Sequence, residues 1–142
     1  MSVRYAPMTL QDYDEAIALW RASEGIGLSA ADERPAIAAY LERNPGMSFT
    51  ARVDGKLAGA VLCSSDGRRG YLHHLAVDPA FRRQDIGAGL ARRCLDALAR
   101  AGIGKCHLFV YGQNLAGRAF WARIGWVERS ELVLMSADVP TP

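Results

Sequence analysis

The strongest constraint on the fold lies in residues 71–98, where the spacing of hydrophobic residues changes from that of a strand to that of a helix. The run YLHHLAV at 71–77 is typical of a short strand, and Asp78-Pro79 ends it. Beyond the proline, apolar residues recur every three or four positions, which favours a long amphipathic helix. The inward face of this helix is predicted to contain Leu90, Ala91, Cys94, Leu95 and Leu98.

The remaining segments predict further strands and helices around this unit. Asp54-Gly55 lies between two apolar runs in 48–65, and it indicates a β-hairpin because both residues tolerate the positive φ angles of a tight turn. Thr9 followed by Asp12 indicates the start of a first helix, which runs to about Arg21. The other expected elements are strands at 2–6, 105–111 and 131–135, and helices at 35–43 and 115–124.

Together these elements predict one α/β domain of three layers that covers residues 1–142. Hairpin strands followed by strand, helix, strand units form a mixed, mostly antiparallel sheet with helices on both faces. With 142 residues, the chain is close to the usual size of a single domain. No repeat, low-complexity tract or linker interrupts the sequence, so no domain boundary is expected.

Composition and charge exclude several classes of function. The net charge of +2 is too small to predict nucleic-acid binding. The three cysteines are odd in number and widely spaced, so neither a disulfide framework nor a metal site is expected. The longest apolar runs are only a few residues, against about 20 for a membrane span, and no signal-peptide stretch is present. We therefore expect a soluble, cytoplasmic protein without nucleic-acid or membrane partners.

A glycine motif lies between the strand at 71–77 and the long helix. Gln84, Gly87 and Gly89 form the pattern Q-x-x-G-x-G at the helix start, where free N–H groups and the positive end of the helix dipole favour phosphate. Such a turn suits a diphosphate. The alternative is that two glycines merely loosen the helix start, and a nucleotide site is disfavoured because neither a Walker lysine nor G-x-G-x-x-G is present.

This stretch resembles motif A of the GNAT acetyltransferases. In that family, an apolar run ending in Val-Asp-Pro leads into the pyrophosphate loop and a long helix, and residues 75–79 (LAVDP) match that run. A second match lies downstream in VYGQNLAGRAFWARIGW, where Asn114 and the closing residues 123–126 are similar to a later family motif. Together the two motifs cover about residues 70–127.

The resemblance implies that acetyl-CoA binds where two parallel strands, here YLHHLAV and CHLFVYG, splay apart. The backbone of Leu75, Ala76 and Val77 would hold the acetyl-pantetheine end, and Asn114 would contact the cofactor arm. The resemblance assigns the diphosphate to the turn formed by Arg83, Gln84, Asp85, Ile86, Gly87, Ala88 and Gly89.

Acetylation of an amine also requires a proton acceptor, because an alkylammonium titrates near pH 10.4. His73 is the candidate base, since the strand resembles the arylalkylamine acetyltransferase branch, where imidazoles relay the substrate proton. Strand alternation predicts Tyr71 and His73 on one face of the sheet and His74 on the other. The alternative for His73 is a histidine packed under a helix, and Tyr111, the candidate acid, has the alternative of an ordinary strand aromatic.

The chain departs from the family pattern at three positions. Trp121 stands where many members have a tyrosine acid, Phe109 where ribosomal-protein acetyltransferases have a glutamate base, and Asp85 where a loop glycine is expected. An acidic side chain there would be repelled by a diphosphate unless it turned outward. These departures leave three options: thiolate protonation by water, protonation by Tyr111 or a nearby group, or a protein that binds the cofactor and turns over poorly.

The resemblance therefore implies an acetyl-CoA-dependent N-acetyltransferase that acts by direct attack in a ternary complex. The acceptor would be a primary amine of a small molecule or of a peptide or protein terminus, and a homodimer is possible. Family members bind the acceptor with the first two helices and their loop, here about 20–44, where Glu24, Asp32 and Glu33 could attract a cationic amine. The alternative is a non-catalytic module that binds or senses acyl-CoA.

Overall fold

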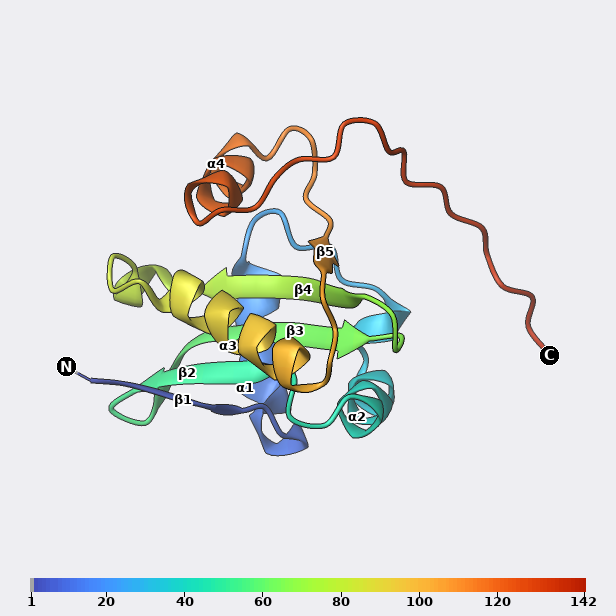
Figure 1. The fold of residues 1–142 in the computed structure, drawn as a ribbon. Helices are drawn as coiled ribbons and strands as arrows, with labels where there is room; N and C mark the ends of the chain where they lie inside the picture. The colour runs from blue at the N-terminus through green and yellow to red at the C-terminus, as the bar shows by residue number, and fades with distance from the viewer. Residues whose placement is uncertain (1) are drawn as a thin grey trace. The chain divides into compact units, whose positions relative to one another are not determined.

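The computed structural model describes residues 2–142, which divide into two compact units, 2–111 and Gly112–Pro142 (Figure 1). The first unit contains the β-sheet and the helices α1, α2 and α3. The second contains α4 (Leu115–Arg123) and the C-terminal segment. The expectation of a single domain over residues 1–142 stays a prediction.

The sheet of the first unit has five strands in the order β1-β2-β3-β4-β5 among the described residues. Neighbouring strands are antiparallel except for β4 and β5, which are parallel. The predicted mixed, mostly antiparallel sheet is therefore confirmed. Its strands are β1 (Val3–Pro7), β2 (Phe49–Val53), β3 (Lys56–Ser65), β4 (Gly70–Val77) and β5 (Cys106–Leu108).

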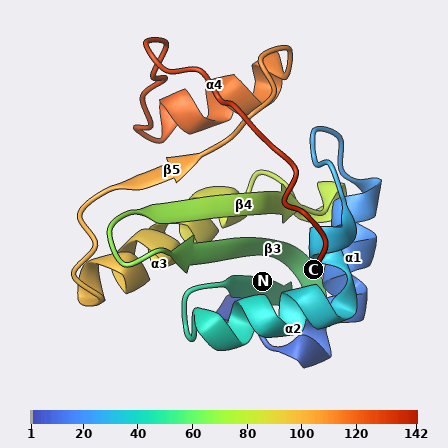
Figure 2. The same cartoon turned by 90° about the vertical axis from the view of Figure 1, so that its right-hand side faces the viewer.

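Helices cover both faces of this sheet, as the sequence predicts. The helix α3 (Ile86–Arg100) lies on one face, and α1 (Tyr13–Ala22) and α2 (Arg34–Arg43) lie on the other (Figure 2). Short 3-10 turns precede all three helices: η1 (Leu10–Asp12), η2 (Ala30–Asp32) and η3 (Pro79–Phe81).

The two hydrophobic layers follow the predicted patterns with one exception. Trp20 and Ile37 are buried against the sheet on the side of α1 and α2, in one cluster with Leu62. Leu90 is completely buried on α3, whereas Leu95 is 40% exposed. The expectation that Leu95 faces inward was thus wrong, because this residue lies at the border of the apolar stripe. The buried positions of α3 are Ile86, Gly87, Leu90, Ala91, Cys94, Ala97 and Leu98.

The hairpin and the first helix start also agree with the sequence. Asp54 and Gly55 adopt φ angles of 51° and 79°, which allow the tight turn between β2 and β3. Thr9 forms a capping box with Asp12, whose carboxylate accepts the Thr9 N–H at 2.9 Å.

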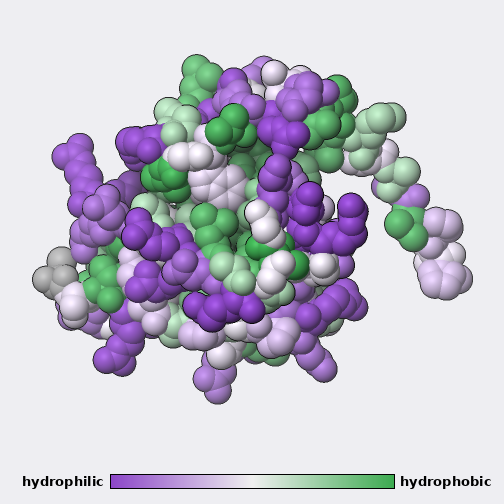
Figure 3. Space-filling view, viewed as in Figure 1, coloured by the Kyte–Doolittle hydropathy of each residue, from purple (hydrophilic) through white to green (hydrophobic). Residues whose placement is uncertain are grey.

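Two expected strands differ from the structure. The strand expected at 105–111 is reduced to β5, because its pairing with β4 ends at Leu72 and Leu108. No strand forms at 131–135, so that expectation was wrong. Leu132 bonds back to the carbonyl of Arg129 in a turn, and the apolar side chains that follow, visible as green residues along the C-terminal segment in Figure 3, are exposed. Strand-forming residues alone do not make a strand without a partner to bond.

Gly59 on β3 sets how closely α3 approaches the sheet. A Cβ at this position would lie 3.0 Å from the Ala76 carbonyl oxygen and from Leu90, and 3.1 Å from Ile86 at the start of α3. The missing side chain therefore lets the first turn of α3 lie directly over β3 and β4.

Replacement of Gly59 by valine should destabilise the fold by about 1–3 kcal/mol, because overpacking displaces the start of α3. Denaturant unfolding followed by circular dichroism measures this change. Gly104→Val is the matched control, since a Cβ at Gly104 meets no atom within 4 Å. Equal stability of the two variants would show that α3 can move away from the sheet at little cost.

Candidate functional site

The central feature of the site is an irregularity in β4 at His74. Ala60 pairs with Ala76 and Leu62 with His73, so two steps along β3 correspond to three along β4. His74 has a φ of 58°, in the left-handed region that residues other than glycine adopt only uncommonly. This is a β-bulge, which changes the side to which the following side chains point.

Because of this bulge, His73 and His74 lie on the same face of the sheet. His73 pairs with Leu62, which belongs to the core under α1, and the His74 ring is 5.3 Å from the ring of Trp20 on α1. The two imidazole centres are 6.4 Å apart. The expectation that the two histidines face opposite sides was therefore wrong, since simple alternation does not account for the extra residue.

His74 is bonded to the buried carboxylate of Asp32, which the sequence suggests only as a residue that could attract a cationic amine. Its Nε2 lies 2.7 Å from Oδ1 of Asp32, whose side chain is 8% exposed. The other carboxylate oxygen of Asp32 accepts the backbone N–H of Ser29 at 3.0 Å, and Tyr13 donates its hydroxyl to the Asp32 carbonyl at 2.7 Å.

The Asp32–His74 bond has a chemical consequence for the imidazole. With Nε2 donating to the carboxylate, the neutral ring carries its free lone pair on Nδ1. The Ser29-x-x-Asp32 capping pattern was visible in the sequence, but its link to a residue 42 positions later depends on the bulge.

His73 is half-buried beside this pair. Its ring stacks on that of Phe109 with the centres 6.1 Å apart. Burial lowers the pKa of His73 below the ordinary value of 6.5, and the neighbouring His74 lowers it further, against an opposing effect of Asp32. At neutral pH His73 is thus an uncharged imidazole that can accept a proton.

β4 has an open edge beyond the bulge. In an antiparallel ladder, residues whose backbone groups bond to the neighbouring strand alternate with residues whose groups point away. The N–H of Asp78 bonds to the Ala58 carbonyl at 2.8 Å, so Leu75 and Val77 direct their N–H and C=O groups away from β3. On that side β5 pairs with β4 only as far as Leu72, which leaves an extended ligand room to bond there. Ala76, by contrast, bonds toward β3.

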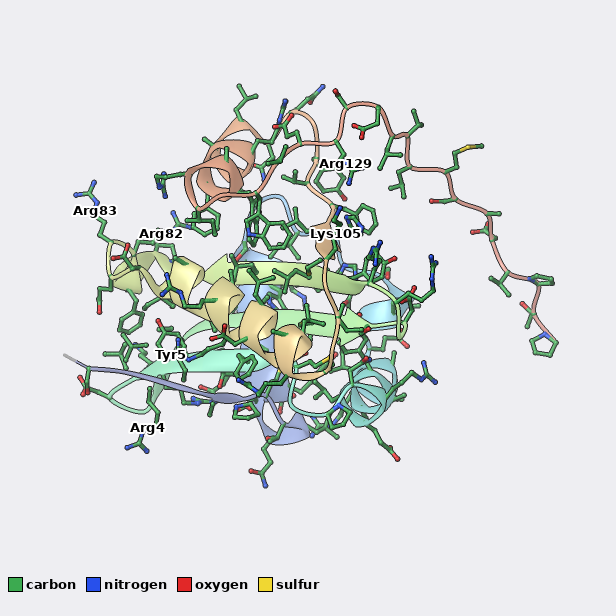
Figure 4. The ribbon with its side chains drawn as sticks, in the orientation of Figure 1. Arg4, Tyr5, Arg82, Arg83, Lys105 and Arg129 are labelled. Atoms are coloured by element: carbon green, nitrogen blue, oxygen red, sulfur yellow. The ribbon has the colours of Figure 1, made fainter. Side chains whose placement is uncertain are left out.

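The turn at 82–89 brings free backbone donors to the start of α3. Gly89 is the first residue whose N–H bonds within the helix, to Asp85 at 2.9 Å, and the Asp85 side chain does not cap the helix. The N–H groups of Ile86, Gly87 and Ala88 are therefore available to an anion. Arg82 and Arg83 project from the same turn (Figure 4).

The backbone conformation at Asp85 explains why the family pattern has a glycine at this position. Its φ is 57°, a left-handed conformation that glycine adopts without cost. Arg83, with a φ of 69°, has the same conformation two residues earlier. The Asp85 residue is exposed, as required if the carboxylate is to stay clear of a bound diphosphate.

The remaining expected site residues lie at the end of the first unit and in the second. Tyr111 is 62% exposed, and its hydroxyl lies where it would be 2.7 Å from a Cβ on Gly27, in the loop between α1 and α2. Asn114 caps α4 by accepting the Gly117 N–H at 3.0 Å, and its contact with a cofactor stays a prediction. Trp121 packs edge-on against Phe120 and Trp126.

Residues 2–142 contain no group of three or more histidine, cysteine, aspartate or glutamate side chains arranged to hold a metal ion. Over the same residues, no helix combines the length and the apolar character that crossing a membrane requires.

Replacement of Asp32 by alanine should destabilise the protein by about 1–3 kcal/mol, because the Ser29 N–H and the His74 imidazole would lose their partner. Urea unfolding measures the loss. Glu33→Ala, one residue away on an exposed side chain, is the control and should change stability little. If both variants unfolded at the same urea concentration, the hydrogen bonds of the Asp32 carboxylate to Ser29 and His74 would contribute nothing to stability beyond what water can replace.

Comparison with known proteins identifies the family of this chain. The acetyltransferase (GNAT) family model matches residues 13–126. "Acetyltransferase ECA0875" of Pectobacterium atrosepticum is 31% identical over 103 residues, which are 72% of each chain.

Two solved structures share the fold. The PaiA N-acetyltransferase of Thermoplasma acidophilum in complex with coenzyme A has a TM-score of 0.78 and 20% identity, over 88% of this chain and 89% of that one. The aminoglycoside acetyltransferase meta-AAC0020 from an uncultured soil metagenomic sample, in complex with sisomicin, has a TM-score of 0.74 and 15% identity over 97% of each chain. The family model covers most of the chain, including the bulged strand β4, its open edge and the glycine turn, and the chain belongs to the GNAT acetyltransferase family.

Proposed function

We propose that this protein transfers the acetyl group of acetyl-CoA to a primary amine of a small molecule or of a peptide or protein terminus. The observation that carries the proposal is the combination of two kinds of free backbone donor in one unit. The edge of β4 at Leu75 and Val77 suits an extended amide-bearing arm, and the N–H groups of 86–88 suit a diphosphate. Acetyl-CoA carries both groups.

Each cofactor-binding residue is proposed to contact the part of acetyl-CoA that its position in this arrangement suits. Leu75, Ala76 and Val77 would hold the acetyl-pantetheine end, with the free N–H and C=O groups on Leu75 and Val77. The turn from Arg83 to Gly89 would hold the diphosphate through its backbone N–H groups. Gln84 and Asp85 would set the backbone conformation of this turn, and their side chains would not contact the phosphates. Asn114 would contact the arm through its Nδ2 group, because its Oδ1 is used by Gly117.

The chemistry follows from a neutral imidazole beside the open edge of β4. An amine loses its proton to His73, directly or through water, and its lone pair attacks the acetyl carbonyl carbon in a ternary complex. The C–N bond forms, and the tetrahedral intermediate collapses with cleavage of the C–S bond. The nitrogen gives up its second proton as the amide forms, and the departing thiolate takes up a proton from Tyr111 or from water, which that second proton restores. The low pKa of His73 supports its part, since an uncharged base is needed at neutral pH.

The acceptor is proposed to be cationic before it reacts. Asp32, the buried carboxylate beside His74, supplies a negative charge near the candidate base, on the loop that family members use for the acceptor. The solved relative bound to sisomicin supports an amine-rich small molecule as one class of acceptor. A peptide terminus is the other class, and an amine panel that contains both distinguishes them.

A non-catalytic acyl-CoA-binding module is the second candidate function. The observation that favours it is the position of Trp121, an indole packed between Phe120 and Trp126 where many family members have a tyrosine acid. Tight CoA binding by calorimetry without thiol release over the whole amine panel would establish this alternative. Thiol release with any amine would exclude it.

Replacement of Gly87 by glutamate should abolish acetyl-CoA binding, because bulk and negative charge enter the turn that is proposed to meet the diphosphate. Because Gly87 is buried, far-UV circular dichroism checks that the variant is still folded. In the native protein, acetyl-CoA at a hundredfold excess over Kd should stabilise the fold by about 2.7 kcal/mol, measured as a rise in Tm. The exposed Gly104→Glu is the control for added charge. ATP and NAD should shift Tm far less than acetyl-CoA, and equal shifts would exclude the cofactor assignment.

His73→Ala should lower kcat/KM by about 10² to 10⁴, the usual contribution of a positioned base. In the native enzyme the acidic limb of kcat/KM should lie below pH 6.5, because the lowered pKa keeps His73 unprotonated until the pH falls through that pKa. His107→Ala, on β5, is the control. If His74→Ala removed the limb and His73→Ala did not, the imidazole held by Asp32 would be the base instead.

A further inference from the structure

A contact between β1 and α3 fixes the turn where the diphosphate is proposed to bind. Tyr5 and Arg4 leave β1 on opposite sides, and Tyr5 points toward the start of α3 (Figure 4). The Tyr5 hydroxyl lies against the backbone of Gly89, so close that a Cβ at residue 89 would overlap with it. Gly89 is therefore a point of contact between helix and strand as well as part of a phosphate-binding pattern.

Arg93, one helical turn later, closes this contact from the other side. Its guanidinium carbon lies 3.5 Å from the centre of the Tyr5 ring, a close cation–π arrangement. Its Nη1 donates to the Gly89 carbonyl at 3.2 Å. Tyr5, Gly89 and Arg93 thus form one unit, which we call the Tyr5 clamp.

The electrostatics of the Tyr5 clamp favour a neutral tyrosine. Burial raises the pKa of Tyr5 above 10.0, while Arg93 lowers it and Asp85 raises it. The ring therefore keeps its hydroxyl proton at neutral pH and remains a good surface for the guanidinium. The effect of Asp85 on the Tyr5 pKa also indicates that the turn residue lies within electrostatic reach of the clamp.

The turn before α3 needs such external support. Arg83 and Asp85 both have positive φ angles, and Asp85 provides no side-chain cap. The Gly89 N–H bonds to Asp85 at 2.9 Å, so a displacement of Gly89 moves the residue that starts the helix. The N–H groups of Ile86, Gly87 and Ala88 lie between these two bonded residues, and their direction depends on both.

We propose that Tyr5 and Arg93 are positioning residues that set the affinity for the diphosphate of acetyl-CoA by holding Gly89 and the first turn of α3 in place. This inference rests on the proposed function, because it concerns the same turn. Neither residue needs to touch the ligand. Their effect reaches it through the backbone of 85–89.

The test compares two ligands that differ in the group concerned. Coenzyme A contains the diphosphate, and pantetheine contains only the arm. Tyr5→Ala should raise the Kd for coenzyme A about tenfold, as expected when a few helix N-terminal donors lose alignment, and leave the weak binding of pantetheine unchanged. Tyr5→Phe keeps the ring under Arg93 and should bind like the native protein.

Arg93→Gln and the double variant complete the design. Arg93→Gln should weaken coenzyme A binding to an extent similar to Tyr5→Ala, and the double variant should be no weaker than either single variant, because both changes release the same contact. Arg4→Gln, on the opposite side of β1, is the matched control. Calorimetry below the Tm of the least stable variant provides the Kd values.

The outcomes separate this inference from the proposed function. If the native protein fails to bind coenzyme A, the proposed function and this inference are both wrong. If the native protein binds and Tyr5→Ala binds equally well, only the inference is wrong. If only Arg93→Gln binds coenzyme A weakly, Arg93 contacts the phosphates directly. If a variant binds coenzyme A and pantetheine equally more weakly than the native protein, the fold as a whole is damaged. Either result overturns the positioning role.

Discussion

The bulge at His74 is the constraint on which the candidate site depends. One extra residue in β4 turns two neighbouring imidazoles to the same face of the sheet, where regular alternation would separate them. The left-handed conformation of His74 is uncommon for a residue other than glycine, and the bond to the buried Asp32 carboxylate holds its side chain in place. The same irregularity coincides with the end of pairing between β4 and β5. The candidate bases and the open strand edge therefore lie next to each other on the same strand.

The second determinant of the site is the close approach of α3 to the sheet. Two glycines without side chains permit it: Gly59 from the sheet and Gly89 from the helix. The helix start thus lies next to the end of β4, and its dipole and free N–H groups are part of the same unit as the open edge. Tyr5 on β1 holds the first turn together with Arg93 of α3 itself, so three strands and one helix determine the position of a few backbone donors.

Much of this arrangement was accessible from the sequence, because it follows from local periodicity. The hairpin at Asp54-Gly55, the helix starting near Ile86 and the phosphate-type turn all leave local patterns that a single sequence displays. The Asp32–His74 pair leaves no such local pattern, since it joins residues far apart in the sequence and depends on a bulge that no residue type predicts. The strand expected at 131–135 failed for the opposite reason: its residue types favour a strand, but strand formation depends on a bonding partner. Chemical roles for His73, Tyr111 and Asn114 stay predictions, because they depend on how the cofactor and the acceptor amine bind.

The open edge of β4 also bears on what kind of chain could pair with it. An unpaired strand edge offers a row of N–H and C=O groups to any extended chain, and natural proteins interrupt such edges to prevent growth of the sheet from one molecule into the next. The bulge at His74 interrupts the even spacing of donors and acceptors along β4, so a regular strand from another molecule would lose register there. The ligand arm proposed to bind here would need only the groups at Leu75 and Val77, which lie to one side of the interruption. One irregular residue thereby makes the edge a poorer template for a regular protein strand than for a short arm.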